Sequence, residues 1–185
     1  MRNNKIKKIV VISGGMGFLG KQYVEELSRG GFSVVILDIV KNSTIQKYVK
    51  YINSKYESNA SGYLVDITNE KKISLISKKI KKKYGKIDVL INNAANNPTF
   101  DKKKFKNKDK LENFSLKNWN LDISVGLTGS FICSKYFGSI ISLNKKGGSI
   151  LNISSDLGLI SPDHRIYNKN DSIKKVKPIS YSVVI

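Results

Sequence analysis

Ser13-Gly14-Gly15-Met16-Gly17-Phe18-Leu19-Gly20 is the stretch that decides the fold of this chain of 185 residues. A continuous apolar run from Lys8 to Ser13 precedes it, which is typical of a strand covered on both faces. A helix follows it and is closed by Gly30-Gly31. Four side chains of this helix are expected to face inward: Phe18, Tyr23, Val24 and Leu27. The first elements are therefore a strand, a glycine-rich turn and a helix.

The alternation of strand and helix continues along the chain. Further strands are expected at residues 32–39, 63–66, 86–91 and 149–153. Helices are expected after Ser43, over residues 69–84 and after Ser115, with the two serine hydroxyls as candidate caps. This order predicts an α/β fold: a Rossmann-like, doubly wound parallel sheet of five strands with right-handed crossovers. We expect residues 1–185 to form a single domain.

The glycine-rich turn carries the first chemical signal. Glycines at positions 14, 17 and 20 allow a sharp turn, a close approach to a pyrophosphate and tight packing of the helix on the sheet. The start of the helix offers free N–H groups and its positive dipole end to phosphates. The alternative is an ordinary tight turn, but the strand before it and the helix after it favour phosphate binding. The candidate cofactor-binding residues here are Ser13, Gly14, Gly17, Phe18, Leu19 and Gly20.

Asp38 stands at the end of the second expected strand. A carboxylate at this place accepts hydrogen bonds from the ribose hydroxyls of a dinucleotide and repels an additional 2′-phosphate. Asp38 therefore favours NAD over NADP as the cofactor. The alternative is a solvated acid at a strand end.

Two further segments follow expected strands, Asp66-Ile67-Thr68 and Asn92-Asn93-Ala94-Ala95. Together with the glycine turn they resemble the short-chain dehydrogenase/reductase family. The resemblance implies that Asp66 and Ile67 lie at the adenine, and that the segment with Asn92 and Ala94 braces the sheet and lines the nicotinamide side. Ala95 stands where the family usually has glycine. Phe18 stands where its compact branch has a further glycine, a spacing similar to the branch that handles sugar nucleotides.

The same resemblance implies two catalytic residues. In the family, a serine after the fifth strand binds the substrate carbonyl or alcohol, and a tyrosine transfers the proton with help from a lysine four residues later. By position these are Ser155 and Tyr181. A phenol has a pKa near 10 and is a poor base at neutral pH unless a cation stabilises its phenolate. Ile185 occupies the lysine position.

Other departures from the family concern the segments near these two residues. Gly126 replaces the asparagine whose backbone helps to hold a proton-relay water, which puts the relay in doubt. The stretch from Ser161 to Pro178 looks like a polar insertion over the active site and holds the sole histidine, His164, interpreted as a surface-loop residue. The resemblance also implies that the last strands of the family fold are missing. We therefore expect an incomplete domain, weak NAD binding and little or no turnover.

Three segments of the second half resemble one subgroup of the family: Ser-Val-Gly-Leu-Thr-Gly-Ser-Phe, Ile-Ser-Ser-Asp-Leu and Pro-Asp-His-Arg-Ile-Tyr. This subgroup acts in flagellin modification and in bacterial surface-sugar synthesis. The resemblance implies an oxidoreductase whose carbohydrate substrate is a sugar phosphate or a nucleotide sugar. The alternative is a non-catalytic nucleotide-binding or interaction protein that kept the dinucleotide site and lost the lysine.

The formal charge of +19 suggests a polyanion partner. The lysines cluster at 78–83 and 102–110, but no aromatic residues interleave with them at base-stacking spacing and no nucleic-acid motif is present. We therefore favour a solvated surface and expect no nucleic-acid partner. The sequence has no apolar run of the length that a membrane helix needs, and no membrane contact is expected. A single cysteine, Cys133, fits core packing in a reducing cytoplasm. No metal site is expected. Family members are usually homo-oligomers, but assembly of this chain is doubtful.

Overall fold

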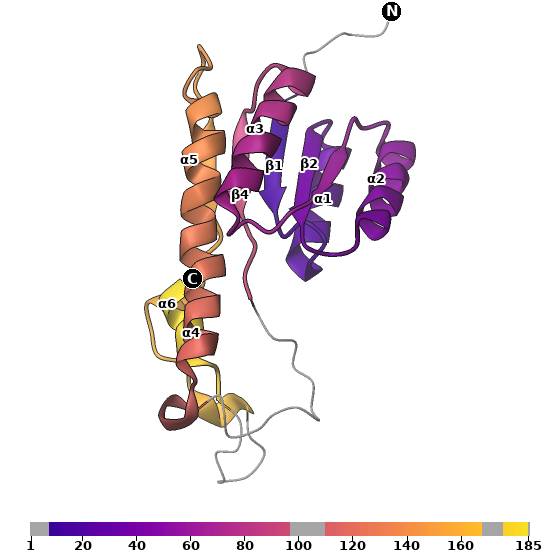
Figure 1. Cartoon of the computed structure of the whole chain (residues 1–185). Coiled ribbons are helices and arrows are strands. Elements are labelled where there is room, and N and C mark those ends of the chain that lie inside the picture. Colours follow the sequence, from indigo (N-terminus) through magenta and orange to yellow (C-terminus); the bar gives the residue numbers. More distant parts are fainter. Residues whose placement is uncertain (1–7, 97–109, 168–175, 185) are drawn as a thin grey trace, which may run out of the picture. The chain divides into compact units, whose positions relative to one another are not determined.

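The computed structural model describes residues 8–96, 110–167 and 176–184 (Figure 1). Contacts between residues divide these into two compact units. Unit 1 contains residues 8–94 and 129–152, and unit 2 contains residues 95–96, 110–128, 153–167 and 176–184. The expected lysine cluster at 102–110 lies outside the described residues except for Lys110. Position 185 and residues 168–175 of the expected insertion between 161 and 178 also lie outside them.

Unit 1 is built on a parallel sheet of five strands. The strands are β1 (Ile9–Ser13), β2 (Ser33–Asp38), β3 (Ser61–Leu64), β4 (Val89–Asn92) and β5 (Ser149–Asn152). Their order is β3-β2-β1-β4-β5, and each neighbouring pair is parallel. The direction of winding reverses between β1 and β4. This arrangement confirms the predicted fold class.

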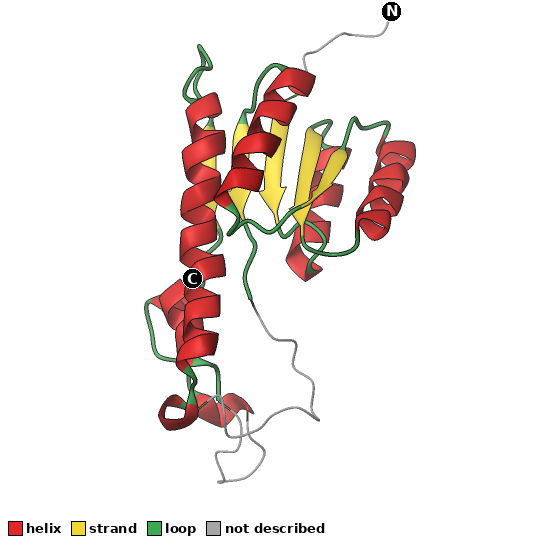
Figure 2. Cartoon of the chain, viewed as in Figure 1, coloured by secondary structure: helices red, strands yellow, loops and turns green. Residues whose placement is uncertain are grey.

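Four helices cover the sheet: α1 (Phe18–Arg29), α2 (Asn42–Tyr56), α3 (Glu70–Tyr84) and α5 (Ser130–Ile141). Helix α1 contacts α2, and α3 contacts α5, so each face of the sheet carries one pair (Figure 2). Because both faces are covered, the central strands β1 and β2 are buried along their whole length. Strand β5 lies at one edge of the sheet, and all four of its residues are exposed.

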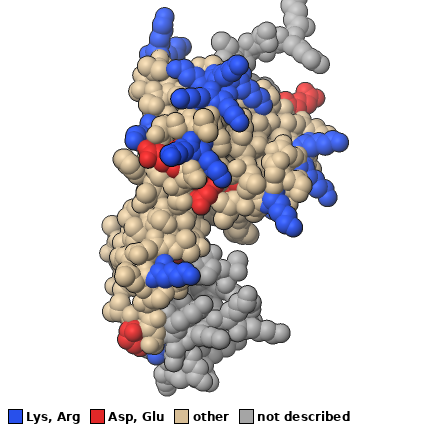
Figure 3. Space-filling model, in the orientation of Figure 1, with Lys and Arg blue, Asp and Glu red and all other residues tan. Residues whose placement is uncertain are grey.

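The helix faces follow the expected periodicity with one exception. Helix α3 buries Ile73, Ile76 and Ile80, while the lysines between residues 78 and 83 are exposed. Lys and Arg side chains are accordingly spread over the surface that Figure 3 shows. The prediction that Phe18 faces inward is wrong, because this side chain is 85% exposed. Helix α1 buries Gly20, Val24 and Ser28 instead, a face that lies on the side of the helix away from Phe18.

Two local predictions also need correction. Ser43 is not the cap of α2, because the helix already begins at Asn42 after Lys41. Strand β3 lies two residues earlier than expected. Asn69 caps α3 by accepting a hydrogen bond from the backbone of Lys72, at the start of the expected helix.

Unit 2 consists of short helical segments. They are η2 (Leu111–Asn113), α4 (Leu116–Ile123), η4 (Asp156–Gly158), η5 (His164–Tyr167) and α6 (Ile179–Val184). A π-helical segment, Ser124–Gly129, follows α4, and all of it except Gly129 belongs to unit 2. Ser115 caps α4 as predicted, accepting a hydrogen bond from the backbone of Asn118. Helix α6 packs against α4 and against η4. Within residues 8–96, 110–167 and 176–184, every helix is too short or too polar to cross a lipid bilayer.

Candidate functional site

The predicted cofactor residues of unit 1 gather where parallel strands end. Ser13, Asp38 and Asn92 are the last residues of β1, β2 and β4. The register pairs Ser13 with Leu37 and Ile12 with Ile91, so the three ends lie at the same edge of the sheet. The winding reverses between β1 and β4, which is where ligands bind in open sheets of this type. The sheet topology therefore places these residues at one candidate site.

Backbone contacts, one of them to β2, hold the glycine turn in place. Gly14 has a φ of 66°, which a side chain would strain, and its N–H donates to the carbonyl oxygen of Leu37 across 2.8 Å. A Cβ atom on Gly20 would overlap the carbonyl oxygen of Gly14 and lie 2.8 Å from the Cα of Gly15. A Cβ atom on Gly17 would meet only the Gly14 oxygen, at 3.2 Å. Glycine is thus required at 14 and 20 by the turn itself, whereas Gly17 leaves an open backbone at the surface.

Helix α1 presents an uncapped N-terminus at this turn. Its N-cap residue is Gly17, which has no side chain, and the first turn from Phe18 to Lys21 holds no acidic residue. Phe18 and Leu19 are exposed on the same turn. The free N–H groups and the positive end of the helix dipole can therefore receive an anion such as a phosphate.

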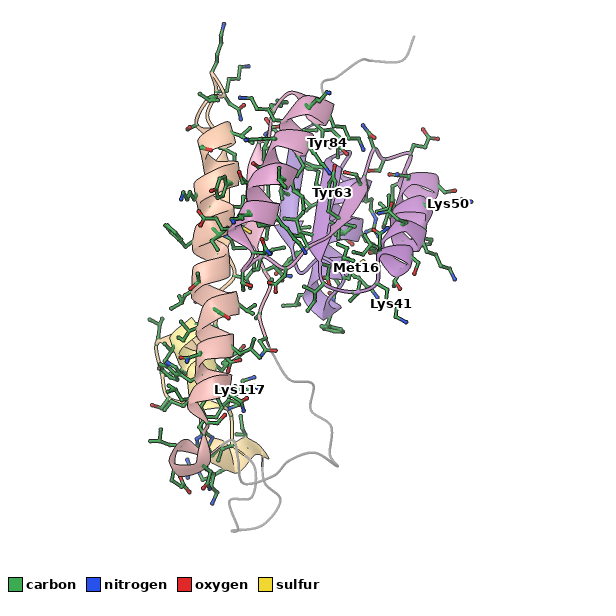
Figure 4. The ribbon with its side chains drawn as sticks, in the orientation of Figure 1. Met16, Lys41, Lys50, Tyr63, Tyr84 and Lys117 are labelled. Carbon is green, nitrogen blue, oxygen red and sulfur yellow. The ribbon has the colours of Figure 1, made fainter. Side chains whose placement is uncertain are left out.

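Asp38 is fixed beside the turn and is not a solvated acid. The residue is only 9% exposed. Its Oδ2 accepts a hydrogen bond from the backbone N–H of Met16 across 2.9 Å, and its Oδ1 accepts from Ile39 and Val40 at 2.8 and 3.2 Å. In Figure 4, Met16 and Lys41, the residue before α2, both lie at the end of the sheet where β1 and β2 finish. Each carboxylate oxygen can accept more than one hydrogen bond, so Oδ2 can still receive a hydroxyl donor.

The segment after β4 is tied to the end of β1. Ser13 is 1% exposed, and its Oγ accepts hydrogen bonds from the backbone N–H groups of Asn93 and Ala94, both at 3.1 Å. The side-chain amide of Asn93 donates in return to the carbonyl oxygens of Ser13 and Gly14, at 3.0 and 3.1 Å. Asn93 was not among the predicted site residues, since the sequence gives no sign that its amide reaches back to the turn. These four bonds make the turn and the segment after β4 one structure.

Asn92 and Asp66 take different places at the same edge. The amide of Asn92 donates to Oδ1 of Asn152 at 2.8 Å and to Oγ of Ser134 at 3.0 Å, and thereby braces β4 against β5 and α5. Asp66 is exposed after β3, and its Oδ1 accepts from the backbone and the hydroxyl of Thr68 at 2.9 and 2.7 Å. The neighbouring Ile67 is 5% exposed. The contact of Asp66 and Ile67 with adenine stays a prediction.

The predicted catalytic residues lie in unit 2. The Oγ of Ser155 donates to Asp156 at 2.9 Å and accepts from the backbone N–H of Leu157 at 3.2 Å, as the N-cap of η4. Tyr181 lies in α6 and is half-buried. Because η4 and α6 pack together, Ser155 and Tyr181 belong to neighbouring elements of one unit. Their catalytic roles stay predictions.

A cation lies against the tyrosine ring. The Nζ of Lys177 is 3.6 Å from the ring centre of Tyr181, within the range of a cation–π contact. Burial lowers the pKa of Lys177 below its ordinary value. The backbone N–H of Lys177 donates to Nδ1 of His164 at 3.4 Å, and His164 is half-buried. Both side chains line an open cavity of about 700 Å³ whose other walls include Leu157, Pro162, Ile179 and Ser182.

Two further observations concern the reactivity of the sole cysteine and the residues that could bind a metal ion. Burial raises the pKa of the Cys133 thiol to about 12, so this cysteine is a neutral core residue rather than a nucleophile. Within the described parts of the chain, no cluster of three or more His, Cys, Asp or Glu side chains could hold a metal ion.

The family model for short chain dehydrogenase matches residues 8–167. The 3-oxoacyl-[acyl-carrier-protein] reductase FabG of Buchnera aphidicola subsp. Baizongia pistaciae (strain Bp) is 35% identical over 152 residues, which are 80% of this chain and 55% of that protein. The sorbitol-6-phosphate 2-dehydrogenase of Escherichia coli (strain K12) is 26% identical over 160 residues, which are 86% of this chain and 58% of that protein. The chain thus spans somewhat more than half the length of these relatives.

Solved structures agree with the fold. An NAD+-bound xylitol dehydrogenase superposes with a TM-score of 0.77 at 20% identity, over 97% of this chain and 60% of that chain. ElxO with NADP bound superposes with a TM-score of 0.74 at 28% identity, over 96% of this chain and 62% of that chain. The sheet order, the glycine turn tied to the segment after β4 and the family match lead to one conclusion: this chain belongs to the short-chain dehydrogenase family.

Proposed function

We propose that this chain binds NAD at the carboxyl ends of the strands in unit 1. It acts as an oxidoreductase that interconverts an alcohol group and a carbonyl group of a carbohydrate. The observation that carries this proposal is the fixed carboxylate of Asp38, which accepts the N–H of Met16 within the glycine turn. A pyrophosphate would lie at the N-terminus of α1, where Gly17 leaves the backbone open. Bound NAD would supply the acceptor for the hydride.

The preference for NAD over NADP rests on charge. Asp38 is buried beside the turn, and a 2′-phosphate next to its carboxylate would bring two anions together. Lys41 is the nearest cation in the sequence after β2, but it is exposed ahead of α2. Of the two solved structures described above, one holds NAD and the other NADP, so the comparisons leave both cofactors open and Asp38 is the argument for NAD.

In the proposed reaction the hydroxyl of Tyr181 moves the proton and the hydroxyl of Ser155 orients the substrate oxygen. Lys177 over the ring of Tyr181 places a positive charge at the residue that would handle the proton. The non-catalytic alternative has less support, since Ser155 and Tyr181 lie on elements that pack together.

The proposed substrate is a sugar phosphate or a nucleotide sugar of flagellin modification or surface-glycan synthesis, as the three subgroup segments suggest. The similarity to a sorbitol-6-phosphate dehydrogenase supports a phosphorylated carbohydrate. Lys177 and His164 line the cavity of unit 2 and could receive an anionic group there.

The experiment is a titration followed by a turnover assay on the 185-residue chain. We expect saturable but weak NAD binding by calorimetry and still weaker binding of NADP. With a panel of sugar phosphates and nucleotide sugars we expect at most a slow, substrate-dependent reduction of NAD, which Tyr181→Phe abolishes. NAD binding without turnover on any substrate would support the non-catalytic alternative. Absence of NAD binding by the folded chain would overturn the proposal.

A further inference from the structure

Asp122 is a buried acid that the reaction described above does not use. It lies on α4 and is 9% exposed. Its Oδ1 accepts a hydrogen bond from the side-chain amide of Asn96 across 2.7 Å, and its Oδ2 accepts one from the hydroxyl of Ser180. All three residues belong to unit 2. A buried carboxylate is stable only when hydrogen bonds replace its lost hydration, so both bonds matter to this residue.

The bond to Ser180 acts directly beside the candidate tyrosine. Ser180 is 1% exposed and immediately precedes Tyr181 in α6. Helix α6 covers only Ile179–Val184, and a helix of this length does not persist without tertiary contacts. The position of Tyr181 therefore depends on what holds α6.

A second contact holds the other end of α6. A Cβ atom on Gly126, in the π-helical segment after α4, would lie 2.6 Å from the Cβ of Val184 and 3.1 Å from its carbonyl oxygen. Only glycine permits this close approach. Asp122 thus holds the start of α6 through Ser180, and the lack of a side chain at Gly126 leaves room for Val184 at its end. Tyr181 lies between these two contacts in the sequence of α6.

We propose that Asp122 is a positioning residue that sets the place of Tyr181 through Ser180, with Gly126 providing the space for α6. The inference rests on the proposed function, in which the hydroxyl of Tyr181 moves the proton. It assigns Asp122 no contact with substrate or cofactor.

The test compares Asp122→Asn, Ser180→Ala and Ser180→Thr with a control, Asp163→Asn. Asp163 is a carboxylate of the same unit, but it is exposed and pairs with Arg165. One readout is amide hydrogen exchange of residues 179–184, and a second is the fluorine NMR signal of fluorotyrosine at 181, assigned by its loss in Tyr181→Phe. Both readouts work without turnover, and NAD titration of each variant reports separately on unit 1.

We expect Asp122→Asn and Ser180→Ala to speed exchange in α6 about tenfold and to move the Tyr181 signal, while exchange in β1 and β2 stays unchanged. Ser180→Thr keeps a hydroxyl and should lie closer to the parent chain. Where turnover is measurable, kcat should fall with the KM for NAD unchanged. A parent-like α6 and Tyr181 signal in both Asp122→Asn and Ser180→Ala would overturn the proposal. If the variants change exchange in α6 and the Tyr181 signal as expected but the parent chain does not bind NAD, the proposed function is contradicted while the positioning role of Asp122 stands.

Discussion

The backbone N–H of Met16 donates a hydrogen bond to Oδ2 of Asp38 across 2.9 Å, and this bond joins the turn after β1 to the end of β2. The two residues are 22 positions apart in the chain. Oδ1 of the same carboxylate accepts from Ile39 and Val40, so the acid cannot turn away from the glycine turn without losing three bonds. A group that would bind ribose is thus fixed before any ligand arrives, which reduces the entropy lost on binding.

The turn glycines should respond differently to alanine. Gly20→Ala places a methyl group against the backbone of Gly14 and Gly15, which cannot move aside, and should lower the free energy of unfolding by about 3 kcal/mol. Gly17→Ala meets one backbone oxygen at 3.2 Å and should leave the fold stable while weakening NAD binding, because its methyl group lies where a phosphate approaches. Urea unfolding and NAD titration separate the two effects.

Gly30→Ala is the control for this pair. Its added methyl group would meet the ring of Phe32 at 3.3 Å, and that side chain can shift. It should change neither stability nor NAD affinity appreciably. Equal loss of stability in all three variants would contradict the packing argument.

Ser13→Ala should destabilise the fold. The substitution leaves the backbone N–H groups of Asn93 and Ala94 without the acceptor that the structure shows, and each such loss costs about 1–3 kcal/mol. Ser28→Ala is a matched control, since Ser28 is equally buried and its Oγ has no hydrogen-bond partner among the described residues. Urea unfolding should show a clear loss for Ser13→Ala and little or none for Ser28→Ala; similar curves would refute the role given to Ser13.

Cys133 should resist thiol reagents in the folded chain. Burial raises the pKa of its thiol from 9.0 to about 12, so the thiolate is scarce at neutral pH. The unfolded chain ionises this thiol more readily, so its contribution to stability is complete below pH 9 and is lost as the pH rises toward 12. Modification by a disulfide reagent should follow the rate of unfolding, and Cys133→Ala should flatten part of the alkaline loss of stability. Rapid stoichiometric modification of the native chain would contradict this account.

The sequence was sufficient for the parallel sheet of five strands, for the succession of strands and helices along the chain, and for most residues at the strand ends. Continuous apolar runs such as Lys8 to Ser13 are typical of strands with two covered faces, and β1 is such a strand. Strand β3 begins two residues earlier than predicted and contains Gly62, a residue type that is uncommon in strands. In the structure a Cβ atom at Gly62 would overlap the side chain of Ile45, so glycine is there to let α2 pack on β3.

The contacts that complete the candidate site could not be read from the sequence, because they join distant segments. Asn93 reaches back 80 residues to Ser13, and Asp122 receives a hydrogen bond from Ser180, 58 residues away. Composition and periodicity report which face of an element is buried, but not which polar side chain finds a partner across the fold. Phe18 illustrates a similar difficulty, because an aromatic residue in the first turn of a helix can lie on the solvent-exposed side of that helix as well as on the buried side.

The central claim is that the carboxylate of Asp38 forms part of a dinucleotide site, and calorimetric titration of NAD into Asp38→Asn and Asp88→Asn tests it most directly. Asp88 also accepts a backbone hydrogen bond, from Ile9 at 2.7 Å, but it precedes β4 and so lies at the opposite end of the sheet. We predict about tenfold weaker NAD binding for Asp38→Asn, with a smaller difference between NAD and NADP, and unchanged NAD binding for folded Asp88→Asn. Equal NAD affinity in the parent chain and in a folded Asp38→Asn chain would contradict the account.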